Sequence, residues 1–295
     1  RDKPIPARTH AVMPRTAATR DRPAIADVTA RVLANTHLSD DYNVLALAAP
    51  EIAAGARPGQ FVMLKPRPGH DPLLRRPFSI FEILRDANGS PTGLTILNKR
   101  AGRTTGLLAG IAPRESVACL GPLGRPFGIV DPPAEAWMVA GRVGLAPFAT
   151  LAGALIARGT AVTLFYGARR DADLHCAGTF ERRGVSIVFS TEDGSRGDRG
   201  LVTVPLARAL ERRGGTAVHL YACGPTPMMR AVAALAGRHG CRCDVSLEQV
   251  MGCGLGGCYS CVVRVRETPG GTPHFVRSCS DGPVFDAARI VWEEL

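Results

Sequence analysis

Residues 131–147 read DPPAEAWMVAGRVGLAP and separate two parts of the chain that have different patterns. The prolines at 132 and 133 interrupt helix and sheet pairing, which is typical of a linker. The apolar run at 137–140 has the length of a buried strand, and a glycine-rich turn follows it before a helical segment begins. We therefore expect a domain boundary at residues 131–133.

Upstream of this linker, short strand-like runs are punctuated by Gly and Pro. They lie at 28–33, 42–48, 60–65, 92–97 and 115–120. Regular short strands with turn residues between them are typical of an antiparallel barrel. The sequence predicts a β-barrel domain over residues 23–132, after a basic and disordered tail at 1–22.

Downstream of the linker, strands alternate with helical segments, which predicts a parallel sheet covered by helices. Strands are expected at 137–140, 162–166 and 217–222, and helices at 148–158 and 227–238. This α/β domain should span residues 133–243. Residues 244–295 are too few to bury a large core of their own, so a metal centre should stabilise them.

The C-terminal region contains a cysteine cluster, Cys253-x4-Cys258-x2-Cys261, followed by Cys279. This is the plant-type spacing for a [2Fe–2S] cluster with four thiolate ligands. Interspersed glycines allow the backbone to approach an inorganic core closely. A structural zinc site is the alternative, although only Cys258 and Cys261 form the CxxC pair that zinc knuckles use.

The remaining five of the nine cysteines carry no such pattern. Cys119, Cys176 and Cys223 are isolated, and Cys241 and Cys243 should flank a turn. Buried, unreactive thiols are the default interpretation. Because no signal peptide precedes so many cysteines, we expect a reducing compartment and a cytoplasmic protein rather than a disulfide framework.

The net charge of +10 does not indicate nucleic-acid binding. Several basic residues fall in the first 22 positions, and elsewhere no basic stripe is interleaved with aromatic residues. No run of about 18 apolar residues suggests a membrane span. We expect neither nucleic acid nor membrane among the partners.

Two segments of the predicted barrel fit a flavin dinucleotide. Arg76-Pro77-Phe78-Ser79 supplies a cation for a pyrophosphate and a small hydroxyl for the ring edge. Arg-Pro pairs also occur at ordinary strand edges. Residues 102–108 form a glycine turn into a short helix that suits phosphate, or else a plain helix capped by Thr104.

Two loops of the α/β domain fit a nicotinamide dinucleotide. Gly141 and Gly144 lie in the turn after the first strand, and Cys223-Gly224-Pro225 ends a later one. Ligands of such sheets bind at the carboxyl ends of the strands. The two loops together indicate a nucleotide site.

With these motifs assembled, residues 25–230 resemble the ferredoxin-reductase superfamily. Within it the chain is similar to the electron transfer subunits of class B dihydroorotate dehydrogenases. The likeness rests on the flavin motif at 76–79, on Leu97-Asn98-Lys99 and Thr104-Thr105 as further FAD contacts, and on the ending at 279–285. It departs at Arg142, where the superfamily usually has a glycine, and at Phe78, where many relatives have tyrosine.

The resemblance implies that electrons pass from the FMN of a catalytic partner subunit through [2Fe–2S] and FAD to NAD, in pyrimidine biosynthesis, within a heterotetramer. Because the cofactors carry the chemistry, we assign no catalytic residue. Arg169 and Arg170 are placed to attract a 2′-phosphate, but the resemblance favours NAD over NADP. Near the cluster, we expect at least one of Leu255, Tyr259, Val284 and Phe285 to contact the partner.

Three other functions stay open at this point. The flavoprotein subunit of a ferredoxin:NADP oxidoreductase or sulfide dehydrogenase shares this domain order. An oxygenase reductase fits less well, because such reductases usually carry a complete ferredoxin-like domain. A non-catalytic zinc-binding protein would require the flavin motif to be accidental.

Overall fold

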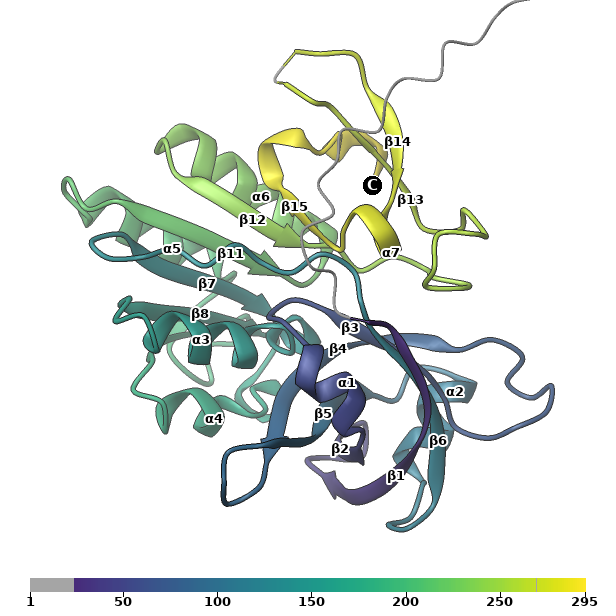
Figure 1. Ribbon diagram of the computed structural model, residues 1–295. Helices are drawn as coiled ribbons and strands as arrows, with labels where there is room; N and C mark the ends of the chain where they lie inside the picture. The colour runs from purple at the N-terminus through teal and green to yellow at the C-terminus, as the bar shows by residue number, and fades with distance from the viewer. Residues whose placement is uncertain (1–23, 269) are drawn as a thin grey trace, which may run out of the picture.

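The computed structural model describes residues 24–268 and 270–295, so the tail expected at 1–22 lies outside the described residues. Two main sheets organise the described chain (Figure 1). One closes into a six-stranded antiparallel barrel, and the other is a seven-stranded sheet covered by helices. The predicted fold class, a barrel followed by a parallel-sheet domain and a small C-terminal module, is confirmed.

The barrel has the strand order β1-β2-β5-β4-β3-β6. Its strands are β1 (Ala26–His37), β2 (Tyr42–Ala48), β3 (Phe61–Lys65), β4 (Arg76–Arg85), β5 (Pro91–Lys99) and β6 (Ser116–Leu123). Apolar side chains such as Leu45, Leu47, Ile80 and Ile96 are fully buried inside it. Helix α1 (Pro50–Gly55) adds Ile52 to this core, and α2 (Arg103–Ala109) adds Leu108.

The second sheet has the order β10-β9-β8-β7-β11-β12-β15, and all its neighbouring strands are parallel except β12 and β15. Its strands are β7 (Glu135–Gly141), β8 (Val162–Ala168), β9 (Ser186–Thr191), β10 (Asp198–Arg199), β11 (Val218–Cys223), β12 (Arg242–Ser246) and β15 (Val284–Asp286). Its carboxyl ends face the barrel side of the molecule (Figure 1).

Helices cover both faces of this sheet. They are α3 (Phe148–Ile156), α4 (Ala177–Glu181), α5 (Thr203–Arg212) and α6 (Thr226–Arg238). Phe148 and Phe180 of α3 and α4 belong to one apolar cluster, and Leu206 and Val232 of α5 and α6 belong to another. The sheet is therefore doubly wound, as parallel sheets require to bury both faces.

The C-terminal module consists of a hairpin, β13 (Val262–Val265) with β14 (His274–Arg277), and the short helix α7 (Ser278–Asp281). The chain then adds β15 to the edge of the α/β sheet, where Asp286 pairs with Asp244 of β12. This pairing fastens the module to the sheet. Cys243 lies within β12 rather than beside a turn, so that sequence expectation is wrong.

Candidate functional site

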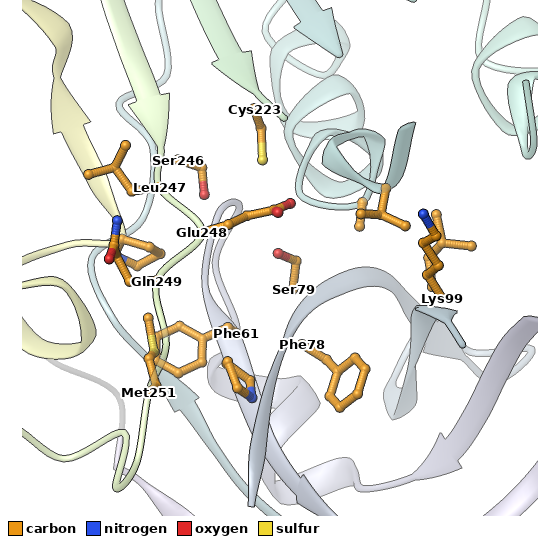
Figure 2. Close-up of a pocket in the computed structure, with 15 residues that line it drawn as sticks. Phe61, Phe78, Ser79, Lys99, Cys223, Ser246, Leu247, Glu248, Gln249 and Met251 are labelled. Atoms are coloured by element: carbon orange, nitrogen blue, oxygen red, sulfur yellow. The ribbon is translucent and has the colours of Figure 1, made fainter. Parts of the chain in front are cut away.

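A cavity of about 240 Å³ lies where the barrel, the α/β sheet and the segment after β12 meet (Figure 2). Its lining comprises Phe61, Pro77, Phe78, Ser79, Leu97, Lys99, Val143, Ala146, Cys223, Ser246, Leu247, Glu248, Gln249, Met251 and Pro283. The structure thus brings together predicted site residues from three elements: β4, β5 and the end of β11. We call this space the flavin cavity.

Three polar side chains point into the flavin cavity. Figure 2 shows the Ser79 hydroxyl, the Cys223 thiol and the Glu248 carboxylate directed toward one another. Glu248 faces the cavity and remains exposed to solvent, but nearby protein atoms displace part of its water, which raises the pKa of its carboxyl above the ordinary value, while Lys99 opposes this shift. The carboxyl can therefore hold a proton beside the cavity at a higher pH than a solvated glutamate.

Sequence reasoning did not identify Glu248. It lies in irregular chain between β12 and the cysteine cluster, where no periodicity or motif marks one side chain. Its position in the cavity depends on the long-range pairing of β12 with β11 and β15. The only sequence signal was a carboxylate between a buried strand and a predicted metal centre.

Arg76 lies outside the lining of the flavin cavity. Its side chain is exposed at the start of β4, and its guanidinium donates to the carbonyl of Arg75 at 3.1 Å. These weak local contacts leave the charge available to a ligand that extends from the cavity along β4. The structure therefore places Arg76 beside the flavin cavity rather than inside it.

Asn98 is fully buried and points away from the flavin cavity. Its amide donates to the Asn43 side chain at 2.7 Å and to the carbonyl of Thr105 at 3.0 Å. Asn43 in turn donates to Asn35, whose amide donates to carbonyls at the end of α2. This chain of asparagines fixes α2 on the barrel.

The start of α2 is capped by Thr105. Its hydroxyl accepts hydrogen bonds from the amides of Ala101 and Gly102, at 2.8 and 2.9 Å. Thr104 is buried instead, so the alternative that Thr104 caps this helix is wrong. Thr105 thus holds the glycine turn in place, and neither threonine lines the flavin cavity.

The flavin cavity fits the ring system of FAD. Its walls are mostly apolar side chains, including Phe61, Phe78 and Leu97, and its polar side chains are spread around the cavity, with Ser79 and Glu248 between Gln249 on one side and Lys99 on the other (Figure 2). A flat aromatic ring with polar atoms on its rim needs mostly apolar walls and a few hydrogen-bonding groups, as this cavity provides. Ser79 and Lys99 supply hydrogen-bond donors toward that space.

A second cavity of about 280 Å³ lies at the carboxyl ends of β7, β8 and β11. We call it the dinucleotide cavity, and it is lined by Gly141, Arg142, Gly167, Ala168, Glu192, Gly200, Leu201, Val202, Thr203, Pro225, Pro227, Met228 and Ala231. It includes the predicted Gly141 and Pro225. Parallel sheets receive nucleotides at this edge, so the placement fits a nicotinamide dinucleotide.

The turn after β7 is too tight for a larger residue at Gly144. A β-carbon there would lie 2.2 Å from the carbonyl oxygen of Cys223, which is backbone and cannot move aside. At Gly141 a β-carbon would meet Met228 and Pro225, each at 2.9 Å. The two predicted glycines therefore bring the turn against the β11 loop.

The four predicted cluster ligands lie in two pairs. Cys258 interacts with Cys253, and the amide of Cys279 donates to the Cys261 sulfur at 3.4 Å. Among the described residues, no three His, Cys, Asp or Glu side chains converge closely enough for one shared ion. Two pairs of thiols fit a two-iron cluster, in which each iron takes two protein ligands.

Backbone amides surround these sulfurs. Leu255 and Gly257 each donate to the Cys253 sulfur at 3.3 Å. Hydrogen bonds from Ser260 lower the pKa of the Cys258 thiol to about 6, which favours the thiolate that metal binding requires. Gly254 adopts φ +74°, and a β-carbon there would lie 2.6 Å from Met63. The loop thus fits closely over the barrel.

Five thiols lie outside this group. Cys119, Cys223 and Cys243 are buried, whereas Cys176 and Cys241 are only half-buried. Burial raises the pKa of all five. A raised pKa keeps a thiol neutral, so these side chains have little of the thiolate character that reactive cysteines show.

Comparison with known proteins gives two family matches. Residues 248–291 match the iron–sulfur cluster binding domain of dihydroorotate dehydrogenase B. Residues 138–234 match the oxidoreductase NAD-binding domain. These ranges contain the four paired cysteines and all the lining residues of the dinucleotide cavity.

Curated relatives cover most of the chain. The electron transfer subunit of dihydroorotate dehydrogenase B (NAD(+)) from Desulforamulus reducens is 36% identical, over 90% of this chain and 98% of the relative. The protein of the same name from Geobacillus kaustophilus is 41% identical, over 80% of this chain and 87% of the relative.

Solved structures show the same fold. An NADH-dependent reduced ferredoxin-NADP oxidoreductase, described in terms of flavin-based electron bifurcation, superposes with a TM-score of 0.77 at 26% identity, covering 90% of this chain and 91% of that one. A cytochrome P450 reductase from Amycolatopsis gives a TM-score of 0.63, also at 26% identity, covering 75% and 68%. No helix in the described residues is long and apolar enough to cross a membrane.

Proposed function

The chain belongs to the family of dihydroorotate dehydrogenase B electron transfer subunits, and on this premise we propose that it passes electrons from the FMN of a catalytic partner subunit to NAD⁺. Its cofactors are FAD and a [2Fe–2S] cluster, with NAD as substrate. The reaction would serve pyrimidine biosynthesis. The thiolate ligands suit a cytoplasmic location, where thiols stay reduced.

The observation that carries this proposal is the shared core between the cluster cysteines and the flavin cavity. Cys261 and Cys279 pack in one apolar cluster with Phe61 and Met251. Phe61 and Met251 also line the flavin cavity. On another side of the same cavity, Val143 and Cys223 come from the α/β domain. Electrons would therefore pass from the cluster to the flavin and then to the nicotinamide.

The protein's own residues position these centres. FAD supplies the exchange between single electrons and hydride, because flavin accepts one or two electrons. Ser79 and Lys99 offer hydrogen bonds to the ring edge, and Arg76 offers a cation to the pyrophosphate. Glu248 can hold a proton at the cavity wall, and the apolar lining excludes water.

We assign the four paired cysteines, Cys253, Cys258, Cys261 and Cys279, as the cluster ligands. The FAD contacts are Arg76, Pro77, Phe78, Ser79, Leu97 and Lys99, with Asn98, Thr104 and Thr105 supporting them through α2. The nicotinamide contacts are Gly141, Gly144, Cys223, Gly224 and Pro225. We propose 23–132, 133–243 and 244–295 as the domain ranges, with residues 244–246 of β12 and all of β15 joining the sheet of the second domain.

NAD rather than NADP is supported by the charges at the dinucleotide cavity. Glu192 lines this cavity, whereas Arg169 and Arg170 do not. Arg170 pairs with Asp173 at 3.5 Å. A carboxylate near the nucleotide repels a 2′-phosphate and can accept a hydrogen bond from a ribose hydroxyl. This arrangement fits the family's use of NAD.

The partner would contact the surface beside the cluster. Leu255 and Tyr259 are 57% and 62% exposed, whereas Phe285 is buried in the core of the α/β domain. Exposed apolar side chains next to a redox centre are typical of a protein interface. We propose a heterotetramer in which these two side chains pack on the FMN subunit.

The test combines spectra with reconstitution. Purified chain should contain iron, acid-labile sulfide and FAD, and should oxidise NADH with an artificial electron acceptor but not oxidise dihydroorotate. Addition of an FMN-containing dihydroorotate dehydrogenase subunit should produce dihydroorotate-dependent NAD⁺ reduction. A stable mixture of the two proteins that never shows this coupled activity would contradict the proposal.

A second candidate function is the flavoprotein subunit of a ferredoxin:NADP oxidoreductase, which the structural likeness to such an enzyme supports. It would require reduced ferredoxin to reduce the FAD of the purified chain, and NADP⁺ to accept the electrons. Reduction by ferredoxin together with absence of dihydroorotate coupling would favour this alternative. A colourless, zinc-containing protein would overturn both.

A further inference from the structure

We infer that Arg142 binds the pyrophosphate of the nicotinamide dinucleotide through its side chain, a role that rests on the proposed function. Arg142 lies in the 3₁₀ turn η1 (Arg142–Leu145), directly after β7. It lines the dinucleotide cavity. Turns that follow the first strand of a doubly wound sheet are where the pyrophosphate of a dinucleotide binds.

The backbone of Arg142 is held in a conformation that favours glycine. Its φ is +54°, in the left-handed region that side-chain-bearing residues rarely adopt. Such strain persists at functional sites when the surrounding structure imposes it. Here the neighbouring Gly144 is pressed against the carbonyl of Cys223, which fixes the turn. An arginine has no backbone advantage over glycine at this position, so the proposed role of Arg142 depends on what its side chain can contact in the cavity.

The charge of Arg142 is available to a ligand. None of the ion pairs found among the described residues involves Arg142. It is also the one basic residue among the described residues that line the dinucleotide cavity, where Glu192 is the one acidic residue. An anionic ligand in this cavity therefore meets a single cation, in the turn where its phosphates would lie.

The backbone of this turn offers fewer donors than a typical phosphate-binding turn. The amide of Ala146 donates to the carbonyl of Val143 at 2.9 Å, within the turn itself. Pro147, which precedes α3, has no N–H to donate. A guanidinium can replace these donors, because its planar fork matches two phosphate oxygens. The Arg142 side chain thus supplies the phosphate with hydrogen-bond donors that the backbone at the start of α3 does not supply.

The test is the affinity of the FAD- and cluster-loaded subunit for NAD⁺ and for ADP-ribose, measured by isothermal titration calorimetry. ADP-ribose carries the pyrophosphate without the nicotinamide. The Arg142→Gln substitution should weaken both ligands by the same factor, roughly tenfold to hundredfold, as expected when a charge-assisted hydrogen bond is lost. Arg142→Lys should recover part of this loss.

Salt dependence separates a charge contact from a structural effect. The Kd of the unsubstituted protein should rise with ionic strength more steeply than that of Arg142→Gln. Arg212→Gln, which removes the same charge from the exposed end of α5 outside the cavity, should bind as the unsubstituted protein does. The FAD content of each variant shows that it is folded.

Two results would overturn the inference while leaving the proposed function intact. One is equal affinity of the unsubstituted protein and Arg142→Gln for both ligands. The other is tighter binding by Arg142→Gly, which would show that the side chain crowds the ligand. If the unsubstituted subunit binds neither NAD⁺ nor ADP-ribose, the proposed function itself fails, and the inference fails with it.

Discussion

Glu248 combines a cavity position with a carboxyl whose pKa is raised by partial loss of water, although the residue remains exposed to solvent. Because its pKa is raised, the folded protein holds this proton more tightly than the unfolded chain does, and solvent around the exposed carboxyl keeps the effect small. The free energy of unfolding should therefore fall as pH rises from the ordinary glutamate pKa through the raised one. At lower pH, where both states are protonated, this cost is absent.

We expect Glu248→Gln to remove this fall, because an amide does not ionise. The measurement is the thermal unfolding midpoint of the FAD-loaded protein across a series of pH values. The variant should gain stability relative to the unsubstituted protein as pH rises. Glu211→Gln, an exposed change on α5, is the matched control. Parallel curves for Glu248→Gln and the unsubstituted protein would show that its carboxyl is not shifted.

A second prediction for a single residue concerns Arg76 and FAD binding. Its guanidinium has only carbonyl contacts within its own segment, so its substitution should cost the fold little. Arg76→Ala should weaken FAD binding about tenfold to hundredfold, because charge-assisted hydrogen bonds are worth roughly 1.5–3 kcal/mol. The flavin content of the variant after extensive dialysis measures this loss of FAD binding. Arg85→Ala, at the other end of β4, should keep its FAD; equal retention by both variants would exclude Arg76 as an FAD ligand.

At the scale of elements, local pattern predicted the barrel strands well. The run at 42–48 coincides with β2, and the run at 60–65 begins one residue before β3. These strands alternate or bury apolar residues in short runs, which is the signal that sequence shows. The edge strand β15 and the hairpin β13–β14 were not predicted, because they are short and β15 pairs with a strand far upstream.

The site residues also fall into those that local sequence pattern predicts and those that depend on distant pairing. Motif spacing predicted the cysteines, and the structure brings them together in pairs. Spacing could not show that Asn98 turns inward to Asn43, because its neighbours Leu97 and Lys99 face the opposite side of the strand. Glu248 was not predicted for a related reason, because its position depends on which strands flank β12. Residues whose role is set by distant pairing carry no local signal.

The turn between β7 and α3 should not tolerate a larger residue at Gly144. Gly144→Ala places a β-carbon 2.2 Å from the carbonyl oxygen of Cys223, so the β11 loop must shift. We expect a loss of about 1–3 kcal/mol in the free energy of unfolding. Thermal or denaturant unfolding measures it.

The control is Gly153→Ala in α3, where a β-carbon meets nothing within 4 Å. Because alanine favours a helix over glycine, this variant should be unchanged or more stable by up to about 1 kcal/mol. If the two variants have the same stability, the turn has room that the structure does not show.

The cluster loop, residues 252–261, and the barrel would hold their cofactors through different elements. Cys258 is exposed in irregular chain, whereas the flavin cavity is built on β4, β5 and η1. Cys258→Ser should therefore lose the cluster while keeping most of its FAD. Iron and acid-labile sulfide analysis, with the flavin spectrum, tests this. Cys241→Ser should keep both; a full complement of iron in Cys258→Ser would remove Cys258 from the ligand set.

At the scale of the whole molecule, the three parts are locked around the flavin cavity. Arg183 of the α/β domain pairs with Glu82 of β4 at 2.6 Å, and both side chains are partly shielded from solvent. The Tyr221 hydroxyl donates to the carbonyl of Gly128 at 2.8 Å, which ties β11 to the segment after the barrel. Because the two domains are joined this way, the proposed FMN subunit would reach the cluster from its exposed loop, where Leu255 and Tyr259 lie.

Substitution of Leu255 would test whether the FMN subunit docks at the cluster loop. It is 57% exposed on the cluster loop, and its side chain is not needed for the amide contact to Cys253. Leu255→Ser should weaken association with the FMN subunit roughly tenfold, as expected for loss of one central apolar contact at an interface. The isolated variant should retain iron, FAD and NADH oxidation with an artificial acceptor, because its own centres are untouched. Val204→Ser removes a similarly exposed apolar side chain from α5 and should leave association unchanged. If Leu255→Ser binds the FMN subunit as tightly as the unsubstituted chain does, the partner docks on another surface, and electrons must enter the cluster from a different side.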